Sequence, residues 1–578
     1  MNKHLRVGLV GLLVLGLIVP TTGAALAQRT VERRVGALKA APDHVFVADD
    51  ALYRRYQSGA LTDAEYALER ARSVFALKQV RARYGSVARP ESHAVTLILR
   101  DLAARLHELS GSQRSAAKAI LARPTTPGGE APFPDYGSIP AESTCTATFC
   151  VHWVESGQHA VALVDADGNG IPDWVDGVVE TYEYVVGSFA GNLGYTPVKS
   201  DLTSADNGGS ELPDAYLVDI GADGYYGYCT SDDPNLDDLG DTYAFWDMSG
   251  YCVIDEDFSI AEFPTNTPVA NMQVTAAHEF FHAVQFGYDM FDDTFFLEST
   301  AAWVEDVLYD DIDDNYQYLR NSAITYPDIP LDYTDPTDFF IHRYGGWLWF
   351  RFLTESFGDG TNHDVDIVRE MWERAAAREG HPTDVDDYSV LAMKNVLAAH
   401  GADFAEMFGD FNALNWFVEL TYEEGAEYYD YLLSKGADPR PYLLKTHNVS
   451  SGKPTTGSWQ YKSLHLSMAN IAFYPKRGVK SNARLLLKVN GPNANTSPEA
   501  RYVIFYKSGL PGWGAVSLDG SGDGKKRVAF GKGTVTAVIL ALTNASTRYS
   551  CWEDTVLACQ GIPKDDDAKF VWSGALKQ

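Results

Sequence analysis

The segment VTAAHEFFHAVQFGYD, residues 274–289, constrains the fold of this chain more than any other. It places His278 and His282 four residues apart in a largely apolar run, with Glu279 directly after the first. On an α-helix, residues i and i+4 share one face, so both imidazoles can reach a single atom. A buried helix gains nothing from such polar groups unless they are satisfied. The pattern therefore predicts a buried helix over about residues 271–287 whose histidines bind a zinc ion.

Glu279 has a different part in this pattern, because it is rotated by about 100° around the helix from His278. From that position its carboxylate can approach a water molecule on the metal without binding the metal itself. Zinc lowers the pKa of a bound water to roughly 7, so a carboxylate can take its proton at neutral pH. We therefore expect Glu279 to be the general base of a hydrolase.

A third zinc ligand has to come from another part of the chain. The metzincin pattern is excluded, because Gln285 and Tyr288 stand where it requires Gly and His. The better candidate is Glu298, since the small residues after it in LESTAAW would let a second helix approach the first closely. Glu305 lies two turns further along the same face and is the competing ligand. If it does not bind the metal, Glu305 or the adjacent Asp306 can orient a histidine.

These motifs resemble the gluzincin metallopeptidases, in which a HExxH helix is followed by a glutamate in a run such as NEGxAxW. LESTAAW is similar to that run, with Ser299 in place of the usual glycine. Roughly residues 141–375 are also similar to a family of secreted bacterial metalloproteases with HEFFHAVQF and LEGTAxW motifs. The resemblance implies a zincin-like fold, zinc held by His278, His282 and Glu298, and hydrolysis of peptide bonds.

The resemblance also implies an oxyanion donor. Gluzincins use a tyrosine or histidine to stabilise the tetrahedral oxyanion, and FIHRYGGWLWFRFL, residues 340–353, resembles the segment that supplies it. The matching residue is Tyr344, whose hydroxyl would donate a hydrogen bond to the developing charge. His342 and Arg343 are the alternative donors in this segment.

A second metal site is predicted by DADGNGIPDWVD, residues 165–176. Oxygen donors stand at positions 1, 3, 5, 7, 9 and 12 of this stretch, as in an EF-hand-type calcium loop, and glycine stands at position 6. The stretch also resembles the calcium repeats of thrombospondin-type and dockerin modules. We expect one structural Ca²⁺, and an acidic turn without metal is the alternative. The predicted ligands are Asp165, Asp167, Asn169, the carbonyl of Ile171, Asp173 and Asp176.

The start of the chain and its cysteines predict export. Residues 1–27 have a short positive start, an apolar stretch and an Ala-Leu-Ala end, which are typical of a signal peptide; an uncleaved anchor is the alternative. No other stretch is long and apolar enough to span a membrane. We expect a secreted, extracellular protein whose six cysteines form three disulfides. Pairing of neighbours (145–150, 229–252 and 551–559) is the simplest of the fifteen connectivities.

The remaining sequence predicts a multidomain α+β protein. Residues 28–123 have helical patterns, including a capping box at Thr62 and Glu65 and a second helical stretch at about 94–121. Residues 124–140 are a Pro- and Gly-rich linker. Residues 141–440 predict a mainly helical zincin-like catalytic domain with a small sheet. Alternating apolar runs in residues 445–578 predict an all-β sandwich.

Charge completes the functional expectation. The chain has a net charge of −31, divided into +7 over residues 28–125 and −40 over residues 126–578, with the signal making up the difference. An acidic body argues against nucleic acid as a partner and suits cation binding. The basic leader suits a pro-domain held partly by charge, and a merely basic helical domain is the alternative.

We expect a zinc- and calcium-dependent metallopeptidase that acts on protein or peptide substrates. Its C-terminal domain would be an accessory unit that binds a substrate, surface or polymer. The alternative from a different class is a secreted calcium-dependent binding or surface-assembly protein with an inactive zinc site. An aminopeptidase or another zinc hydrolase is the third reading of the same motif.

Overall fold

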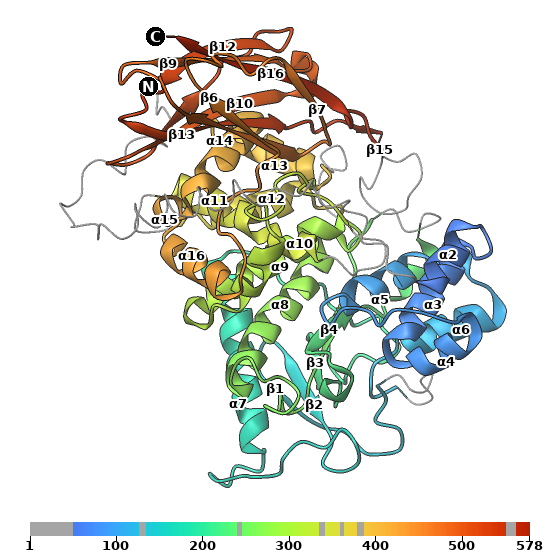
Figure 1. Cartoon of the computed structure of the whole chain (residues 1–578). Helices are drawn as coiled ribbons and strands as arrows, with labels where there is room; N and C mark the ends of the chain where they lie inside the picture. Colours follow the sequence, from blue (N-terminus) through green and yellow to red (C-terminus); the bar gives the residue numbers. More distant parts are fainter. Residues whose placement is uncertain are drawn as a thin grey trace.

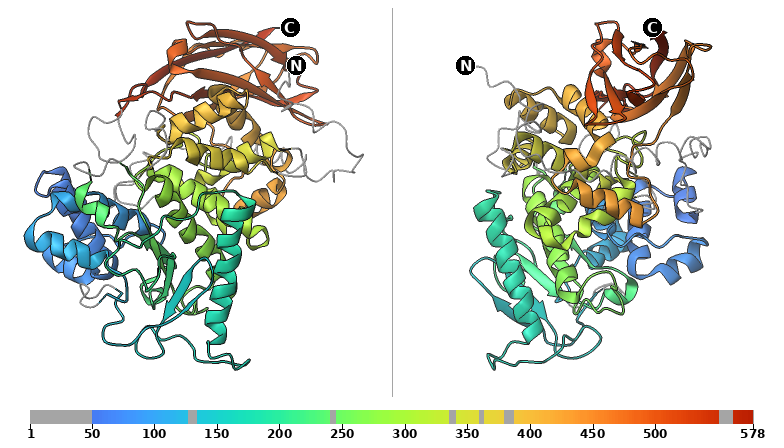
Figure 2. Two further views of the ribbon diagram at one scale, coloured as in Figure 1. Left: turned by 180° about the vertical axis from the view of Figure 1, so that it is seen from behind. Right: turned by 60° about the vertical axis from the view of Figure 1, so that its left-hand side comes forward.

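A computed structural model gives the structure of this multidomain protein, which combines helices with several sheets (Figures 1 and 2). The signal peptide, Cys551 and Cys559 lie outside the described residues, as does the middle of the predicted linker. No helix within the described ranges is long and apolar enough to cross a bilayer. The structure describes residues 50–126, 134–239, 245–334, 341–358, 363–378, 387–550 and 562–577.

Helices make up the N-terminal part, which lies against one side of the molecule (Figure 1). The predicted capping box is confirmed, because Thr62 and Glu65 each accept a hydrogen bond from the other's backbone N–H. The stretch at 94–121 is not one helix, since the chain extends at Ser110 and Gly111 adopts a φ of 53°. The helices are α2 (Ala51–Gln57), α3 (Asp63–Phe75), α4 (Leu77–Tyr84), α5 (Val95–Ala104) and α6 (Gly111–Ile120).

A five-stranded sheet of order β1-β2-β3-β5-β4 follows the linker. Its three inner strands are parallel, and the two edge strands run antiparallel to their neighbours. Disulfides join directly opposed residues at both edges, Cys145 with Cys150 and Cys229 with Cys252, which confirms the neighbour pairing for these four cysteines. The strands are β1 (Glu142–Cys145), β2 (Cys150–Trp153), β3 (Asp214–Leu217), β4 (Gly227–Thr230) and β5 (Tyr251–Ile254).

Helices cover this sheet and continue the chain. The longest, α8 (Pro268–Asp289), packs on α7 (Asp173–Gly187), α9 (Thr294–Leu308), β4 and β5. Every residue of α8 from Val274 to Asp289 is buried, as expected for a helix that is apolar on most sides. The others are α10 (His342–Gly345), α11 (Trp347–Phe357), α12 (Asp366–Arg374), α13 (Ser389–Ala399), α14 (Phe404–Leu414), α15 (Val418–Thr421) and α16 (Gly425–Ser434).

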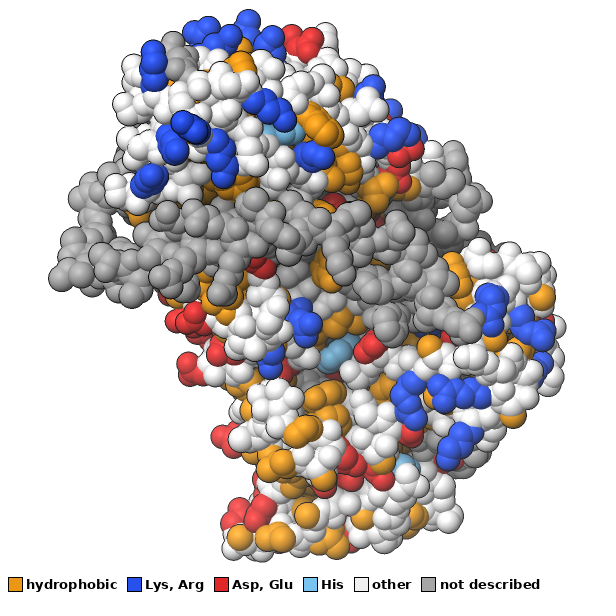
Figure 3. Space-filling model, in the orientation of Figure 1, with side chains coloured by type: hydrophobic (Ala, Val, Ile, Leu, Met, Phe, Trp, Pro, Cys, Tyr) orange, Lys and Arg blue, Asp and Glu red, His pale blue; other side chains and the backbone are white. Residues whose placement is uncertain are grey.

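Most of the C-terminal strands form two sheets with a common apolar core, of orders β11-β10-β13-β8-β6 and β12-β9-β16-β7, while β14 and β15 pair as a separate two-stranded sheet. Their pairs are antiparallel except β6 with β8. Lys and Arg side chains gather over these strands at the top of Figure 3. The strands are β6 (Lys445–Val449), β7 (Trp459–Ser463), β8 (Ser467–Pro475), β9 (Arg484–Asn490), β10 (Pro498–Tyr506), β11 (Gly512–Ala515), β12 (Asp523–Ala529), β13 (Val535–Asn544), β14 (Tyr549–Ser550), β15 (Ile562–Pro563) and β16 (Ala568–Lys577).

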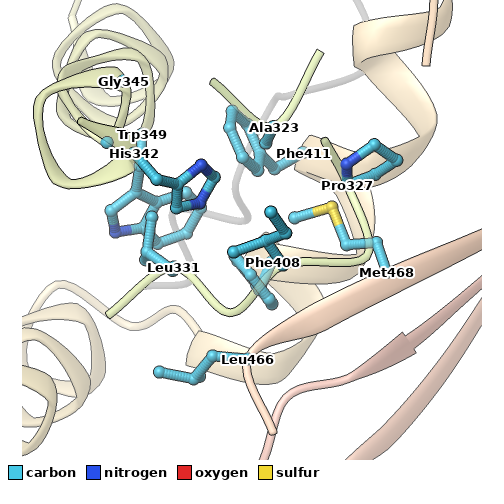
Figure 4. Close-up of a pocket in the computed structure, with 12 residues that line it drawn as sticks. Ala323, Pro327, Leu331, His342, Gly345, Trp349, Phe408, Phe411, Leu466 and Met468 are labelled. Carbon is cyan, nitrogen blue, oxygen red and sulfur yellow. The ribbon is translucent and has the colours of Figure 1, made fainter. Parts of the chain in front are cut away.

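Apolar packing joins these sheets to the helices below them. Figure 4 shows Leu466 and Met468 at the start of β8 facing Phe408 and Phe411 of α14, with His342 and Trp349 on the other side. The cavity between them has a volume of about 10 Å³, about the smallest that can hold one water molecule. The junction is therefore a packed contact that supports the α10–α11 segment from the C-terminal side.

Candidate metal centre

The first two predicted ligands lie at the centre of the molecule on α8. His278 and His282 are both buried, and their ring centroids are 4.9 Å apart. The polar side chains can be accommodated there because each imidazole uses its Nδ1 atom for a hydrogen bond with a neighbouring side chain. Both Nε2 atoms remain on the side that faces α9.

Glu298 of α9 lies opposite these Nε2 atoms. Its Oε2 atom is 3.3 Å from His278 Nε2 and 3.6 Å from His282 Nε2, and one ligand atom from each residue lies within 4.8 Å of the others. The close approach depends on the small residues that follow Glu298, because Ser299, Thr300, Ala301 and Ala302 are all fully buried. The structure thus brings together the three side chains that the sequence predicts as zinc ligands.

Tight packing also brings the α10 segment onto α9. Ser299 Oγ donates to the carbonyl of Arg343 at 2.5 Å. A Cβ atom on Gly345 would lie 2.5 Å from the carbonyl oxygen of Asn321, and one on Gly346 would collide with Ser299. Gly346 is therefore required by the close approach of this segment to α9, and Gly345 by its close approach to the backbone of Asn321 and Ser322.

Glu305 and Gln285 hold the outer sides of the imidazoles. Glu305 Oε1 lies 2.6 Å from His278 Nδ1, so the competing ligand occupies the orienting position instead of the shared one. Gln285 Oε1 lies 2.7 Å from His282 Nδ1. Asp306, the other expected orienting residue, contacts Asn315 and Arg351 and neither histidine.

The orientation of Gln285 determines the tautomer of His282. Gln285 Nε2 donates to the carbonyl of Leu297 at 2.9 Å and to Thr300 Oγ1 at 3.0 Å, so only its oxygen is left for the imidazole. His282 Nδ1 must then carry the hydrogen, which leaves Nε2 as a lone pair aimed at the Glu298 carboxylate. His282 Nε2 and Glu298 Oε1 are buried and have no hydrogen-bond partner among the described residues. Acceptors that converge in this way fit a bound cation, and the donor set is one that zinc accepts.

Glu279 and Tyr344, the predicted catalytic residues, both contact the N-terminal part of the chain. Thr96 Oγ1 of α5 donates to Glu279 Oε2 at 2.9 Å, and burial raises the pKa of the Glu279 carboxyl. The Tyr344 hydroxyl donates to the backbone carbonyl of His93 at 2.5 Å, and its ring lies 6.1 Å from that of His278. The short segment that contains His93 and Thr96 thus forms hydrogen bonds with both predicted catalytic residues.

The alternative oxyanion donors take other positions. His342 lines the apolar cavity of Figure 4, and burial lowers its pKa to about 4. The guanidinium of Arg343 lies 5.7 Å from the Tyr344 ring centroid. Tyr344 is therefore the member of this segment whose ring lies against a predicted ligand.

The predicted calcium loop forms a compact, exposed turn directly before α7. Asp165 accepts hydrogen bonds from the N–H groups of Gly168 and Gly170, and Gly170 has a φ of 92°, as the sharp turn requires. Asn169 Nδ2 bridges Asp167 and Asp176. Asp173 instead accepts from Ala166 N, and the Ile171 N–H donates to Asn169 Oδ1.

The carboxylates of the calcium loop do not form a group of three within 4.8 Å of one another. Groups that do so among the described residues, outside the histidine site, are Asp219 with Asp255 and Glu256, Asp255 with Asp257 and Glu262, and Asp306 with Asp310 and Glu424. Asp219 is distant in sequence from the other members of its set, whereas Asp255, Asp257 and Glu262 lie within one short stretch whose spacing matches no metal-binding motif.

Gln285 and Thr96 are the contacts that sequence reasoning missed. Gln285 stands three residues after His282 on the same helix face, so its spacing offered a signal. Thr96 is 183 residues from Glu279 and offered none.

Comparisons with known proteins add little to this site. No protein-family model and no curated protein matches the chain. A periplasmic inhibitor of g-type lysozyme from Aeromonas hydrophila is 12% identical over 23% of this chain and 96% of its own, with a TM-score of 0.15. The pre-peptidase C-terminal domain of a Bacillus anthracis collagenase is 9% identical over 24% of this chain and 99% of its own, with a TM-score of 0.14. Likenesses at these scores carry no argument about function.

Proposed function

We propose that this chain is a secreted zinc-dependent metallopeptidase of the gluzincin type. The observation that carries the proposal is the convergence of the His278 and His282 Nε2 atoms with the Glu298 carboxylate in a buried site. Two imidazoles and one carboxylate form a zinc ligand set that leaves a coordination position open. When bound there, zinc would supply a Lewis acid that polarises a peptide carbonyl and acidifies water.

Glu279 is the proposed general base. Burial raises the pKa of its carboxyl, which brings the proton affinity of the carboxylate closer to that of an effective base at neutral pH. Its Oε2 atom already accepts a hydrogen bond from the Thr96 hydroxyl, so a water molecule in the place of that hydroxyl could be deprotonated there.

Tyr344 is the proposed oxyanion donor. Burial raises the pKa of its hydroxyl well above the usual value, so the group keeps its proton and can donate a hydrogen bond. Its present acceptor is a backbone carbonyl, that of His93, which is the kind of group that a peptide substrate would offer. Donors held in place for a developing charge are usually the largest single contribution to catalysis.

Residues 28–123 are then a pro-domain. Thr96 and His93 occupy the base and the oxyanion donor at the same time, so a substrate cannot use either group while the segment is in place. Two arginines hold the segment further: Arg100 donates to the carbonyl of Asp292, and Arg123 pairs with Asp201, Asp214 and Asp232. We expect the full chain to be inactive until the linker at 124–140 is cut and the segment leaves.

The proposed function also suggests roles for the remaining domains and for the predicted calcium loop. The catalytic zincin-like domain would comprise residues 141–440, and the β-sandwich of residues 445–578 would be an accessory domain. A structural Ca²⁺ in the loop at residues 165–176 would stabilise the native state, because a ligand that binds only the folded chain suppresses unfolding. Such stabilisation suits a protease that works outside the cell.

The test uses the full chain with a recognition site for a sequence-specific protease placed in the linker. Zinc content and hydrolysis of a proteome-derived peptide library are measured before and after cutting, with and without a chelator, by mass spectrometry. We expect zinc in both forms and chelator-sensitive hydrolysis after cutting. Glu279→Gln should lower the rate by about 10²–10⁴-fold at unchanged zinc content. The matched control Glu183→Gln, on the exposed face of α7, should leave the rate unchanged.

Other outcomes of this test would indicate a different function for the chain. A cut protein that holds zinc but hydrolyses no peptide favours the alternative, a secreted calcium-dependent binding protein with an inactive zinc site. Absence of zinc from the parent contradicts the ligand set. Products shortened only by single N-terminal residues would indicate an aminopeptidase.

A further inference from the structure

The C-terminal strands carry a charge opposite to that of the body. Residues 445–578 contain 18 Lys and Arg against 8 Asp and Glu, whereas residues 126–444 contain 10 against 60. In Figure 3 Lys and Arg side chains lie over the C-terminal strands at the top and over the N-terminal helices at the right, while Asp and Glu gather mainly at the lower left. The C-terminal region is therefore basic although the net charge of the whole chain is negative.

The basic residues share the outer face of the sheet β12-β9-β16-β7. Leu485, Leu487 and Val489 of β9 enter the core between the two sheets, so the residues that alternate with them point outward. The neighbouring strands follow the same alternation through their pairing with β9 and β16. The exposed cations of this outer basic face are Lys462, Arg484, Lys488, Lys525, Arg527, Lys569 and Lys577.

Six of these seven cations face one another in pairs across neighbouring strands. Lys488 is opposite Lys525, Arg484 is opposite Lys577, and Lys462 is opposite Lys569. Like charges in directly opposed positions destabilise a sheet. Among the described residues, Lys462 alone of the seven has a carboxylate partner, Asp567 at 3.1 Å. Three pairs of like charges with only one carboxylate partner make this face strongly positive, so it is suited to binding anionic groups of a partner molecule.

A groove with a volume of about 640 Å³ lies at the end of the outer basic face where β9 ends and β12 begins. Lys488 and Lys525 line it together with Asn490 and Ser573, which add amide and hydroxyl groups. Asp519 and Asp523 also line the groove, and Asp523 accepts a hydrogen bond from Asn490 at 2.8 Å. The lining can thus pair with anionic groups and also accept hydrogen bonds from hydroxyl groups.

We propose that the outer basic face binds a linear acidic polysaccharide. Charge complementarity supports this partner, since neighbouring strands about 4.8 Å apart present rows of paired cations to an extended chain of anionic sugars. The carboxylates in the groove suit sugar hydroxyls. The proposal does not depend on the peptidase activity.

Other anionic partners fit this face less well. The aromatic side chains of these four strands stand at positions that alternate with the outward ones. Trp572 lines the groove but is only 3% exposed, and Trp459 is 40% exposed but has Lys445 Nζ 4.0 Å from its ring centroid, so neither offers a free ring face on which nucleic-acid bases could stack. Their apolar side chains, such as Leu486 and Val571, are only partly exposed and do not offer the aromatic and large apolar anchors with which proteins enter a bilayer.

The test measures binding of the full chain to dextran sulfate and polygalacturonate at low salt, with neutral dextran as the reference. Lys488→Gln with Lys525→Gln removes two charges from the groove. The control, Lys526→Gln with Lys532→Gln, removes two exposed charges nearby; Lys526 is adjacent to Lys525 but pairs with the inward-facing Leu487. We expect the groove variant to raise the Kd about tenfold or more and the control about twofold or less. The groove variant should melt at or above the parent's temperature, because one repulsive pair is gone.

Three results would overturn the proposal. If both double variants weakened polysaccharide binding equally, the net charge of the protein would explain the binding without a specific groove. Equal affinity for neutral dextran would exclude recognition of anions. Tighter binding to phosphatidylglycerol vesicles or to a single-stranded oligonucleotide than to both acidic polysaccharides would assign the face to a membrane or to nucleic acid.

Discussion

Gln285 gives the sharpest test of the metal centre, because it contacts His282 and neither of the other predicted ligands. Its oxygen lies 2.7 Å from His282 Nδ1, and its amide nitrogen is committed to the Leu297 carbonyl and Thr300 Oγ1. The amide therefore orients the imidazole and leaves its Nε2 atom for the metal. Replacing the amide with a side chain of similar size should weaken zinc binding without removing a ligand.

The magnitude follows from the hydrogen bonds that Gln285→Leu removes. Loss of a partner that orients a metal ligand typically weakens metal binding by about 10–100-fold, or about 1.4–2.7 kcal/mol. The variant also leaves the His282 N–H and the Leu297 carbonyl without the amide in a fully buried place. A buried polar group that loses its partner costs about 1–3 kcal/mol, so the zinc-free protein should lose stability by a similar amount.

The assay is zinc competition against a chromogenic chelator, combined with denaturant unfolding of the zinc-free protein. Thr300→Val is the matched control, because Thr300 also contacts the Gln285 amide but does not contact the histidine. We expect it to lose about 1 kcal/mol of stability and to keep its zinc affinity within about twofold. A folded Gln285→Leu variant with the zinc affinity of the parent would refute the reasoning that the amide orients the ligand.

Three further predictions concern stability. Although burial lowers it, Asp332 and Asp566 raise the pKa of His465 to about 10. The protonated imidazole therefore stabilises the folded protein fully below the unfolded-state pKa of about 6.5, and this stabilisation is lost as the pH rises toward 10. Denaturant titrations from pH 6 to 10 should show the free energy of unfolding decline by at most about 5 kcal/mol, and the decline should be smaller in His465→Gln. Removing the Cys229–Cys252 disulfide, whose cysteines are 23 residues apart, should lower the free energy of unfolding by about 3 kcal/mol through chain entropy. Removing Cys145–Cys150, with a separation of 5, should lower it by about 2 kcal/mol. Denaturant unfolding of the two paired Cys→Ala variants measures both losses, and a larger loss for the shorter loop would contradict this order. Millimolar Ca²⁺ should raise the melting temperature of the parent but not of Asp165→Asn with Asp176→Asn, and an equal rise in both would assign the ion to another acidic group.

Local patterns in the sequence determined the elements that carry the site. The four-residue spacing of His278 and His282 sets both on one helix face whatever the rest of the chain does, because the helical repeat is a property of the backbone. The capping box at Thr62 and the alternation of buried and exposed residues in β9 are equally local, and the structure has both. The helical pattern over about 94–121 corresponds to α5 and α6, and apolar spacing alone does not show the break between Ala104 and Gly111.

Tertiary structure alone decided how the polar groups are shared. Glu298 and Glu305 lie on the same face of α9, and only the packing of α9 on α8 sets Glu298 against both histidines and Glu305 against the far side of one. The meeting of Thr96 with Glu279 spans 183 residues, so it has no periodicity that a sequence could display. Spacing along one helix is set by backbone geometry, whereas contacts between helices depend on how all the side chains between them fill the available space.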